Sequence, residues 1–357
     1  MTGNLKKIMS VVGESTLDAV LITSPENRFY ATGFRSTAGA AIISEERATF
    51  FVDSRYVEEA QAQIKGADVV RAEGQKKFFE QLTDYLRAEG IEKLGAEERS
   101  LSYAGYKKYE ENLSAILIPA QSLLENLRAI KSREELEIMI RAQRTAERAF
   151  LRMLPQISRN VTEKELAAEL NCLMLKEGAE DRSFDTILVS GAHSSIPHGK
   201  PRDVKIEQGF LTIDFGCIVD GYCSDTTRTL CVGEPTSEMV KVYNTVLGAQ
   251  TAARDAARGG MTGRELDAVA RTVISDAGYG EYFTHSLSHG LGIEIHESPS
   301  AAPSVETVLH AGAVISNEPG IYIPGKFGVR IEDVLYLTPG GCEDITELSR
   351  ELTVICA

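Results

Sequence analysis

The segment DFGCIVDGYCSDTTRT, residues 214–229, sets three aspartates into an otherwise apolar, β-branched run. A DG dipeptide starting at Asp220 between two strand-like runs is a strong signal for a two-residue hairpin turn. A hairpin that turns there places Asp214 opposite Thr227. Asp225 then shares the face of Asp214 as its diagonal cross-strand neighbour. We therefore expect Asp214 and Asp225 to converge on one point, and Asp220 to serve only the turn.

The surroundings of this aspartate pair indicate burial. The run FLTIDFG around Asp214 is apolar on both faces, which argues against the alternative of ordinary solvated strand acids. Two adjacent buried carboxylates repel each other and resist ionisation unless a positive charge lies between them. A divalent cation is the simplest such charge, and carboxylates with one or two histidines suit Mn, Co, Zn or Fe(II).

Further ligands are expected in the segments SHGLGIEIHE (288–297), SNEPGIY (316–322) and VRIEDV (329–334). Each is weak alone, because a strand histidine is usually a packed core residue and an adjacent Glu-Asp pair is often a surface pair. Two dications balance the charge of four carboxylates. With a bridging hydroxide the cluster carries a net charge of −1, so its burial becomes tolerable. The predicted ligands are Asp214, Asp225, His289, Glu318 and Glu332.

These ligands fall in two similar halves. NVTEKELAAEL (160–170) and GMTGRELDAVA (260–270) each carry a T-x-x-E-L capping box before an apolar-periodic helix. In both, a glycine, an aromatic, a histidine-bearing segment, an acid-ended strand and a second acidic strand follow in the same order. Chance is the alternative, because T-x-x-E is common. The ordered match favours a duplication whose halves meet at a pseudo-two-fold axis.

The 357-residue chain is long enough for two domains. From Leu17 to about Leu124, the strand-like runs LDAVLIT, GAAIIS, ATFFVD and SAILIP alternate with the helical runs RYVEEAQAQI and KKFFEQLTDYLRAEG, which predicts a small α/β domain. Ser132 and Glu135 form a capping box ahead of a long helix. We predict a smaller domain over residues 1–127 and a catalytic domain over residues 128–357.

Composition narrows the function classes. A net charge of −14 argues against nucleic-acid binding, which depends on Lys and Arg. No segment approaches the ~20 apolar residues of a membrane span, and the N-terminus lacks a continuous apolar core, so we expect no membrane association and a cytoplasmic location. The six cysteines lack C-x-x-C spacing and are expected to be reduced, buried thiols, which also disfavours a structural zinc protein.

The motifs PHGKP, IDFG, GYCSDTTRT, SHGLGIEIHE, NEPGIY and VRIEDV occur in this order over most of the chain. This set resembles the pita-bread metallopeptidases, which include aminopeptidase P, prolidase and methionine aminopeptidase, with creatinase as a metal-free relative. The resemblance implies an α+β protein, in which a pita-bread domain with an internal pseudo-two-fold repeat follows a smaller α/β creatinase-type domain. NRFYATGF and FVDSRY look like that amino-terminal domain, which favours the Xaa-Pro branch.

The resemblance also implies roles for individual residues. Asp214 would bind one metal, His289 and Glu318 the other, and Asp225 and Glu332 would bridge them. A metal-bridging hydroxide would attack the carbonyl before proline, and Glu318 would carry the proton to the leaving nitrogen. His198 and His296 look like the two family histidines that contact substrate and stabilise the tetrahedral intermediate, and are expected to be catalytic with Glu318. The family positions that line or support the site correspond here to His285, Tyr322 and Arg330.

Two positions depart from the family pattern. Ser288 stands where many members have Gly, and His193 replaces a common Asn. Strand alternation would also put His289 and His296 on opposite faces, because their spacing is odd, so we expect a bulge at the glycines between them.

The expected enzyme is an Xaa-Pro aminopeptidase or dipeptidase acting on proline-containing peptides or dipeptides. Its expected cofactors are two divalent ions per chain, manganese first, with Co, Zn or Fe as alternatives. The resemblance suggests a homodimer. The alternatives are a creatinase-like hydrolase and an inactive binding module of the same fold, both of which would tolerate the loss of metal ligands.

Overall fold

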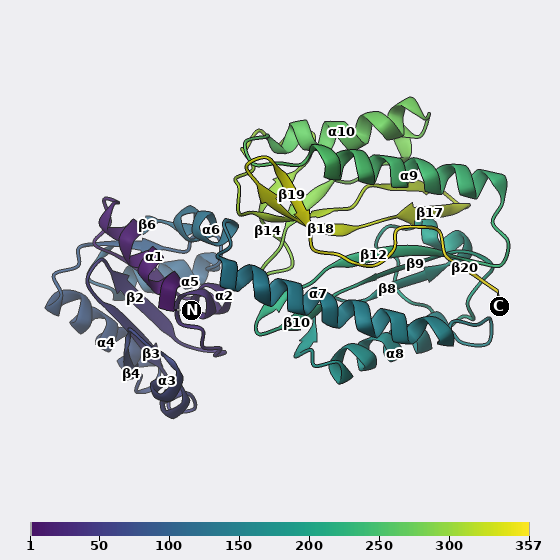
Figure 1. Cartoon of the computed structure of the whole chain (residues 1–357). Coiled ribbons are helices and arrows are strands. Elements are labelled where there is room, and N and C mark those ends of the chain that lie inside the picture. The colour runs from purple at the N-terminus through teal and green to yellow at the C-terminus, as the bar shows by residue number, and fades with distance from the viewer. Residues whose placement is uncertain (1, 357) are drawn as a thin grey trace. The chain divides into compact units, whose positions relative to one another are not determined.

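The computed structural model describes residues 2–356, without the side chains of Thr2, Gln75 and Lys76. Its residues group into two compact units, Met1–Arg128 and Ala129–Ala357. Figure 1 follows the chain through both units, and each is described here by itself. We propose that the units correspond to the predicted domains 1–127 and 128–357.

The first unit is a mixed six-stranded sheet with helices, in the order β4-β3-β2-β1-β5-β6. Its strands are β1 (Ala19–Ile22), β2 (Ala40–Ser44), β3 (Ala48–Val52), β4 (Asp68–Arg71), β5 (Lys93–Ala96) and β6 (Ile116–Pro119). Its helices are α1 (Thr2–Gly13), α2 (Pro25–Thr32), α3 (Val57–Gln63), α4 (Gly74–Ala88), α5 (Tyr103–Asn112) and α6 (Gln121–Ala129). The predicted strands are confirmed as β1, β2, β3 and β6. The strands β4 (DVVR) and β5 (KLGA) were not predicted, because neither contains an apolar run as long as those of the predicted strands.

The second unit has two halves with the same order of elements. Its helices are α7 (Arg133–Met153), α8 (Glu163–Lys176), α9 (Ser237–Ala256) and α10 (Gly263–Asp276), and its short 3-10 turns are η1 (Leu154–Gln156), η2 (Gly191–Ser195) and η3 (Gly280–Tyr282). We call residues 133–232 the first half and residues 237–338 the second half. The predicted capping boxes at Ser132, Thr162 and Thr262 are all confirmed. Gly178 and Gly278, which follow α8 and α10, have φ angles of +105° and +85°, where glycine is favoured.

The first half builds a four-stranded sheet, β20-β12-β9-β8, whose edge strand β20 comes from the end of the chain, and a small sheet, β11-β10-β7. The second half builds the five-stranded sheet β14-β13-β15-β18-β19, whose edge strand β19 directly follows this half, and the hairpin β16-β17. The strands of the first half are β7 (Asp181–Arg182), β8 (Ile187–Ser190), β9 (Gly209–Phe215), β10 (Cys217–Val219), β11 (Tyr222–Cys223) and β12 (Thr226–Val232). Those that follow are β13 (Ser288–Gly290), β14 (Glu297–Ala301), β15 (Val314–Asn317), β16 (Gly320–Ile323), β17 (Phe327–Arg330), β18 (Asp333–Thr338), β19 (Gly341–Asp344) and β20 (Val354–Ile355).

The predicted hairpin register is confirmed. Val219 pairs with Tyr222 across the turn, and Asp214 pairs with Thr227 farther along. Asp220 has a φ of +45°, the positive value that the first position of such a turn requires.

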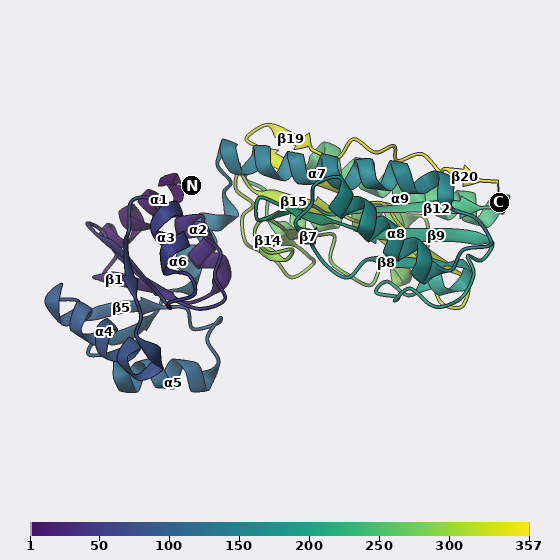
Figure 2. The same ribbon diagram turned by 90° about the horizontal axis from the view of Figure 1, so that it is seen from below.

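Helices cover the sheets of the second unit on two sides. Figure 1 shows α7 and α8 on one side of the strands and α9 and α10 on the other. Figure 2 shows the face formed by α7 and α8, with α8 lying over β8 and β9. The expected α+β class and the repeat within the second unit are thus confirmed.

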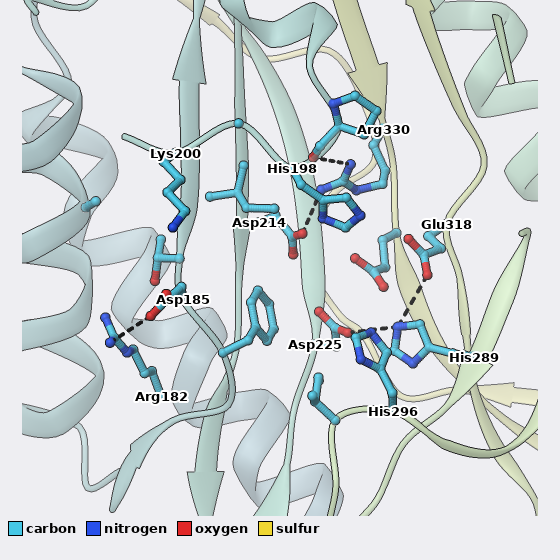
Figure 3. Close-up of a pocket in the computed structure, with 18 of the residues that line it drawn as sticks. Arg182, Asp185, His198, Lys200, Asp214, Asp225, His289, His296, Glu318 and Arg330 are labelled. Carbon is cyan, nitrogen blue, oxygen red and sulfur yellow. Dashed lines mark hydrogen bonds and ion pairs between the residues drawn. The ribbon is translucent and has the colours of Figure 1, made fainter. Parts of the chain in front are cut away.

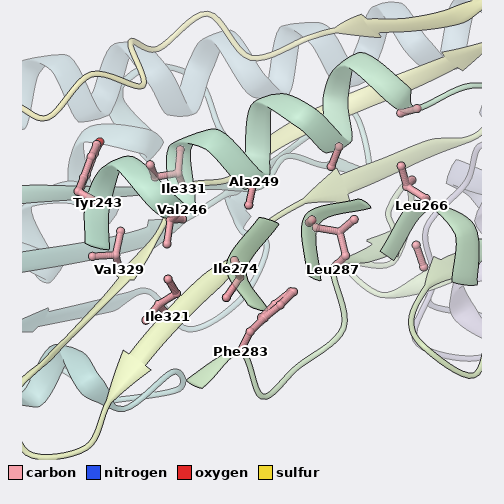
Figure 4. Packing of buried hydrophobic residues seen from close by; sticks show 14 of the residues in the cluster. Tyr243, Val246, Ala249, Leu266, Ile274, Phe283, Leu287, Ile321, Val329 and Ile331 are labelled. Carbon is pink, nitrogen blue, oxygen red and sulfur yellow. The ribbon is translucent and has the colours of Figure 1, made fainter. Parts of the chain in front are cut away.

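Each half packs its own apolar core. Phe150 of α7 stacks on Phe215 of β9 with ring centroids 5.1 Å apart. In the second half, the helix side chains Val246 and Ile274 pack into the same cluster as Ile331 (Figure 4). Truncation of one such buried side chain to Ala typically costs about 2–5 kcal/mol. The two cores therefore hold the sheets, and the acids at their edges, in place.

Among the described residues, no helix is long and apolar enough to cross a membrane. The six cysteines are free. The expectation that all are buried is wrong for three of them, because Cys172 and Cys342 are only half-buried and Cys356 is exposed near the chain end.

Candidate metal centre

The four predicted acidic ligands lie where a strand pair leaves its sheet and continues as a hairpin. In the first half, Asp214 is next to the last residue of β9, and Asp225 directly precedes β12. In the second half, Glu318 directly follows β15, and Glu332 directly precedes β18. The chain thus places two acids of each half at corresponding junctions, as the predicted duplication requires.

The imidazole of His289 lies among these acids. Its Nε2 is 3.4 Å from Asp225 Oδ2 and 3.3 Å from Glu318 Oε1 (Figure 3). Its backbone N–H donates to Ser316 Oγ at 3.0 Å, and Ser316 Oγ donates to Glu318 Oε1 at 3.0 Å. Ser316 therefore holds the ligand strand and the Glu318 carboxylate at the same time.

The local path of β13 resolves the odd spacing of the two histidines. The register shifts between Ser288 and Gly290, so the irregularity lies at His289 itself, just before the glycines where a bulge was expected. The strand then ends at Gly290, and residues 291–296 form a loop without strand alternation. The ring of His296 returns to within 4.4 Å of the His289 ring, centroid to centroid and nearly perpendicular.

The geometry of the cluster fits a divalent cation. One ligand atom from each of Asp225, His289 and Glu332 lies within 4.8 Å of the others. Asp214 Oδ1 and Asp225 Oδ1 are buried and have no hydrogen-bond partner among the described residues. Buried carboxylate oxygens of this kind are normally satisfied, so these two atoms favour a bound positive ion. Oxygen ligands with one imidazole suit Mn, Co, Zn or Fe(II) rather than a thiolate-type site.

The electrostatics of the cluster point the same way. Burial raises the pKa of Asp225 to about 7, and burial raises the pKa of Asp214 despite the nearby Arg330. The pKa of Glu332 is raised well above its usual range by burial and by the charge of Asp225. Burial lowers the pKa of His289, but its hydrogen bond to Asp225 and the charge of Glu318 raise it overall, to about 9. The site therefore lacks positive charge for its acids.

Arg330 supplies part of that charge and organises the site from one side. Its Nη2 donates to Asp214 Oδ2 at 2.6 Å, and its Nη1 donates to Tyr322 Oη at 2.7 Å. Its Nε donates to Thr227 Oγ1 at 3.0 Å, and the Thr227 hydroxyl donates to Glu332 Oε2 at 2.6 Å. Sequence reasoning missed Thr227 as part of the site, although the confirmed register already placed it opposite Asp214.

One cavity of about 830 Å³ contains the five predicted ligands. Four of the five residues predicted to contact substrate or line the site also line it: His198, His285, His296 and Arg330. The fifth, Tyr322, is buried, and its Oη lies 3.1 Å from His285 Nε2. The far side of the cavity in Figure 3 carries Lys200 and the ion pair of Arg182 with Asp185. The structure thus brings together all ten residues predicted from sequence.

The histidines differ in their surroundings. Burial lowers the pKa of His296, and the charge of the neighbouring His289 lowers it further. Burial likewise lowers the pKa of His285. His198 lies on the exposed segment after η2, beside Pro197, whose carbonyl accepts a 3.3 Å hydrogen bond from Arg330 Nη1. A neutral imidazole offers one N–H donor, which suits His296 for binding a substrate oxygen. The donor of His285 is its Nδ1–H, which is directed to the Ser286 carbonyl at 2.8 Å.

Of the two departures noted in the sequence, Ser288 lines the cavity and His193 does not. Ser288 is buried next to His289 and lines the cavity, and its Oγ has no hydrogen-bond partner among the described residues. His193 lies in η2, whose Ser194 hydroxyl accepts from the Gly328 backbone N–H at 3.0 Å.

Comparison with known proteins extends over the whole chain. Residues 137–339 match the model of metallopeptidase family M24, and residues 4–130 match that of the creatinase/prolidase N-terminal domain. The Xaa-Pro dipeptidase of Pyrococcus furiosus is 39% identical over 99% of this chain and 100% of its own. The structure is similar to that of an Xaa-Pro dipeptidase from Bacillus anthracis, with a TM-score of 0.95, 42% identity and 99% coverage of both chains. It is also similar to an X-Pro aminopeptidase from Thermotoga maritima, with a TM-score of 0.92, 36% identity, and 98% and 99% coverage.

Proposed function

The chain belongs to metallopeptidase family M24, and from that premise we propose that it hydrolyses the bond between an amino-terminal residue and a following proline. Divalent-metal binding and peptide hydrolysis are properties of this family. The observation that carries the proposal is that five predicted ligands and three imidazoles share one cavity. Similarity to Xaa-Pro dipeptidases and an X-Pro aminopeptidase over nearly the full chain supports the choice of substrate.

We assign two divalent cations to the site. Asp214 would hold one, His289 and Glu318 the other, and Asp225 and Glu332 both. The unpartnered oxygens of Asp214 and Asp225 and the raised pKa values of the acids support this assignment. Manganese is our first choice of ion, with Co, Zn and Fe as alternatives, because the ligands are mainly carboxylates.

The cations would supply Lewis acidity, which polarises the scissile carbonyl and lowers the pKa of a water ligand towards about 7. The protein's own groups then handle protons and hydrogen bonds. Glu318, which is half-buried beside His289, would take the proton of the attacking water and pass it to the proline nitrogen. That nitrogen carries no hydrogen in the peptide, so it must gain one before it can leave as an amine.

Two imidazoles would act on the substrate oxygens. His296 would donate a hydrogen bond to the oxygen of the scissile carbonyl, where negative charge develops; such a donor is typically worth about 10²–10³ in kcat. His198 would steady the departing proline. Tyr322 and Arg330 would keep His285 and Asp214 oriented through the hydrogen bonds described above.

We further propose a cytoplasmic homodimer. The free cysteines support a reducing compartment, and the family resemblance supports the dimer. Light scattering of the purified chain tests its oligomeric state.

Hydrolysis assays test the function directly. Metal-free protein is reloaded with Mn²⁺ and given Ala-Pro, Ala-Pro-Ala, Ala-Ala and creatine. We expect cleavage before proline in at least one proline peptide and none of Ala-Ala. Cleavage of creatine alone would indicate a creatinase-like hydrolase, and inactivity of the loaded protein towards all four would indicate a binding module; either outcome contradicts the proposal.

A further inference from the structure

A buried ion pair lies next to the His296 loop, outside the ligand set. Lys131 Nζ is 2.7 Å from Glu297 Oε1, and their side chains are 1% and 7% exposed. Lysine is almost never buried to this degree without a partner, because the desolvation of its charge is costly. This contact therefore constrains both residues strongly.

The two partners come from distant parts of the chain. Lys131 immediately precedes the capping residue of α7, and its backbone N–H donates to Gly312 O at 2.8 Å. Glu297 is the first residue of β14 and directly follows His296. The pair thus attaches the end of the His296 loop to the start of α7.

The close packing of the loop explains two glycines, Gly292 beside the ion pair and Gly290 at the end of β13. A Cβ atom at Gly292 would overlap the Glu297 carboxylate and lie 3.1 Å from Lys131 Cε. A Cβ at Gly290 would lie 2.6 Å from the backbone oxygen of Glu297. The loop therefore passes against the ion pair at van der Waals distance.

The other end of the loop is held separately. Cys223 N–H donates to Gly292 O at 2.7 Å, and Cys223 lies two residues before Asp225. Between Gly292 and Glu297 the loop has no strand pairing. Glu297 pairs with Gly290 across β14 and β13, and its Oε2 accepts from the Glu294 backbone N–H of the loop at 3.4 Å. The Glu297 carboxylate therefore joins Lys131 to the loop that carries His296.

We propose that Lys131 is a positioning residue for the peptidase reaction: through Glu297, it holds His296 against the metal centre. The inference rests on the proposed function, in which His296 binds the scissile carbonyl oxygen. A positioning contact for one group loses its effect when that group is absent, which separates this role from general stabilisation.

A double-mutant cycle tests the inference. Lys131→Met should lower kcat towards Ala-Pro about tenfold, with KM changed less than twofold and metal content unchanged. In a His296→Ala background, the same substitution should lower kcat less than twofold. Glu297→Gln, which keeps a hydrogen-bonding partner for the ammonium, should show the same pattern more weakly, and it serves if Lys131→Met does not fold.

Arg144→Met is the matched control. Arg144 pairs with the buried Glu147 on α7 at 2.6 Å, away from the cavity lining. This variant should lower the melting temperature and leave kcat and KM unchanged. A kcat for Lys131→Met within twofold of wild type, or an equal loss with and without His296, would overturn the proposal.

A readout without catalysis separates this inference from the proposed function. In metal-free protein carrying 13C-labelled histidine, the Cε1–H resonance of His296, identified by its loss in His296→Ala, should shift at fixed pH in Lys131→Met and stay in place in Arg144→Met. An inactive wild type with this shift would overturn the proposed function alone. An active wild type without the shift would overturn the inference alone.

Discussion

The two halves of the second unit use the same plan with different residues. In each half, a capped helix, α8 or α10, carries a buried acid. That acid accepts hydrogen bonds from the backbone of a segment that carries or precedes a histidine. In the first half, Glu163 accepts from the Ser190 N–H at 2.8 Å and from the Arg202 N–H at 2.9 Å. In the second half, Asp267 accepts from the Leu287 N–H at 3.1 Å.

The halves differ in where they place their histidines. Residues 196–201 of the first half form an exposed loop without strand pairing, so His198 reaches the cavity from its surface. In the second half, the loop 291–296 follows β13 as residues 191–201 follow β8, and it carries His296. β13 itself pairs with β15 and brings His289 among the acids, whereas its counterpart β8 pairs with β9 and carries no histidine. The comparison therefore assigns metal binding to both halves through acids, but to the second half alone through histidine.

The largest effect is expected from a substitution in the second half. His289→Ala removes the imidazole from between Asp225 and Glu318, so the proposed cation site loses its histidine ligand. We expect kcat/KM towards Ala-Pro to fall on the order of a thousandfold and metal content to fall with it. Elemental analysis of the purified variant, alongside the assay, checks both. Wild-type activity with wild-type metal content would remove His289 from the centre.

A histidine change in the first half should separate chemistry from metal binding. His198→Ala leaves every carboxylate ligand in place, so metal content should equal that of the wild type. Because the imidazole is expected to steady the departing proline, kcat should fall about a hundredfold. An unchanged kcat, or a loss of metal, would contradict the difference between the halves.

The buried acids of the two helices should be equivalent for stability. Glu163→Gln and Asp267→Asn each weaken charged hydrogen bonds and should lower the free energy of unfolding by about 2 kcal/mol. Burial would raise the pKa of Glu163, but hydrogen bonds from Arg202 and Ser190 lower it overall. Its contribution to stability is therefore present above the unfolded-state pKa of 4.5 and is lost as pH falls through the lower folded-state pKa.

Urea unfolding at several pH values measures the free energy of unfolding of both variants. The difference between Glu163→Gln and wild type should shrink as pH is lowered below that unfolded-state value. A difference that stays constant down to the acid limit would show that the Glu163 carboxylate does not act through its charge.

The smallest expected effect lies at the contact between the halves. Thr227 of the first half joins Arg330 to Glu332 of the second half through its hydroxyl. Thr227→Val keeps the shape of the side chain and removes those hydrogen bonds, so metal affinity should fall about tenfold. Calorimetric titration of metal-free protein measures this, and Thr229→Val, which alters the same strand two residues away, serves as a comparison.

The strand register of the first half could be predicted from the sequence in more detail than that of the second half. The Asp220 turn left only one register, so the pairing of Asp214 with Thr227 followed from local chemistry. His289 and His296 could not be placed in the same way, because β13 shifts register and ends after three residues. A short irregular strand leaves no period in the sequence.

The ion pairs of the site had no sequence signal. Arg330 and Asp214 are 116 residues apart, and Lys131 and Glu297 are 166 residues apart. Contacts at such separations depend on how the two halves pack, and neither helical nor strand periodicity reports them. Resemblance to a family placed Arg330 near the site, but its partner and that of Lys131 required the three-dimensional structure.

The central claim is that both halves together hold two cations. Anomalous diffraction at the manganese edge from crystals grown with Mn²⁺ tests it most directly. We predict two peaks per chain, one in contact with Asp214, one in contact with His289 and Glu318, and both in contact with Asp225 and Glu332. A single peak, or peaks bound by residues of only one half, would contradict the claim.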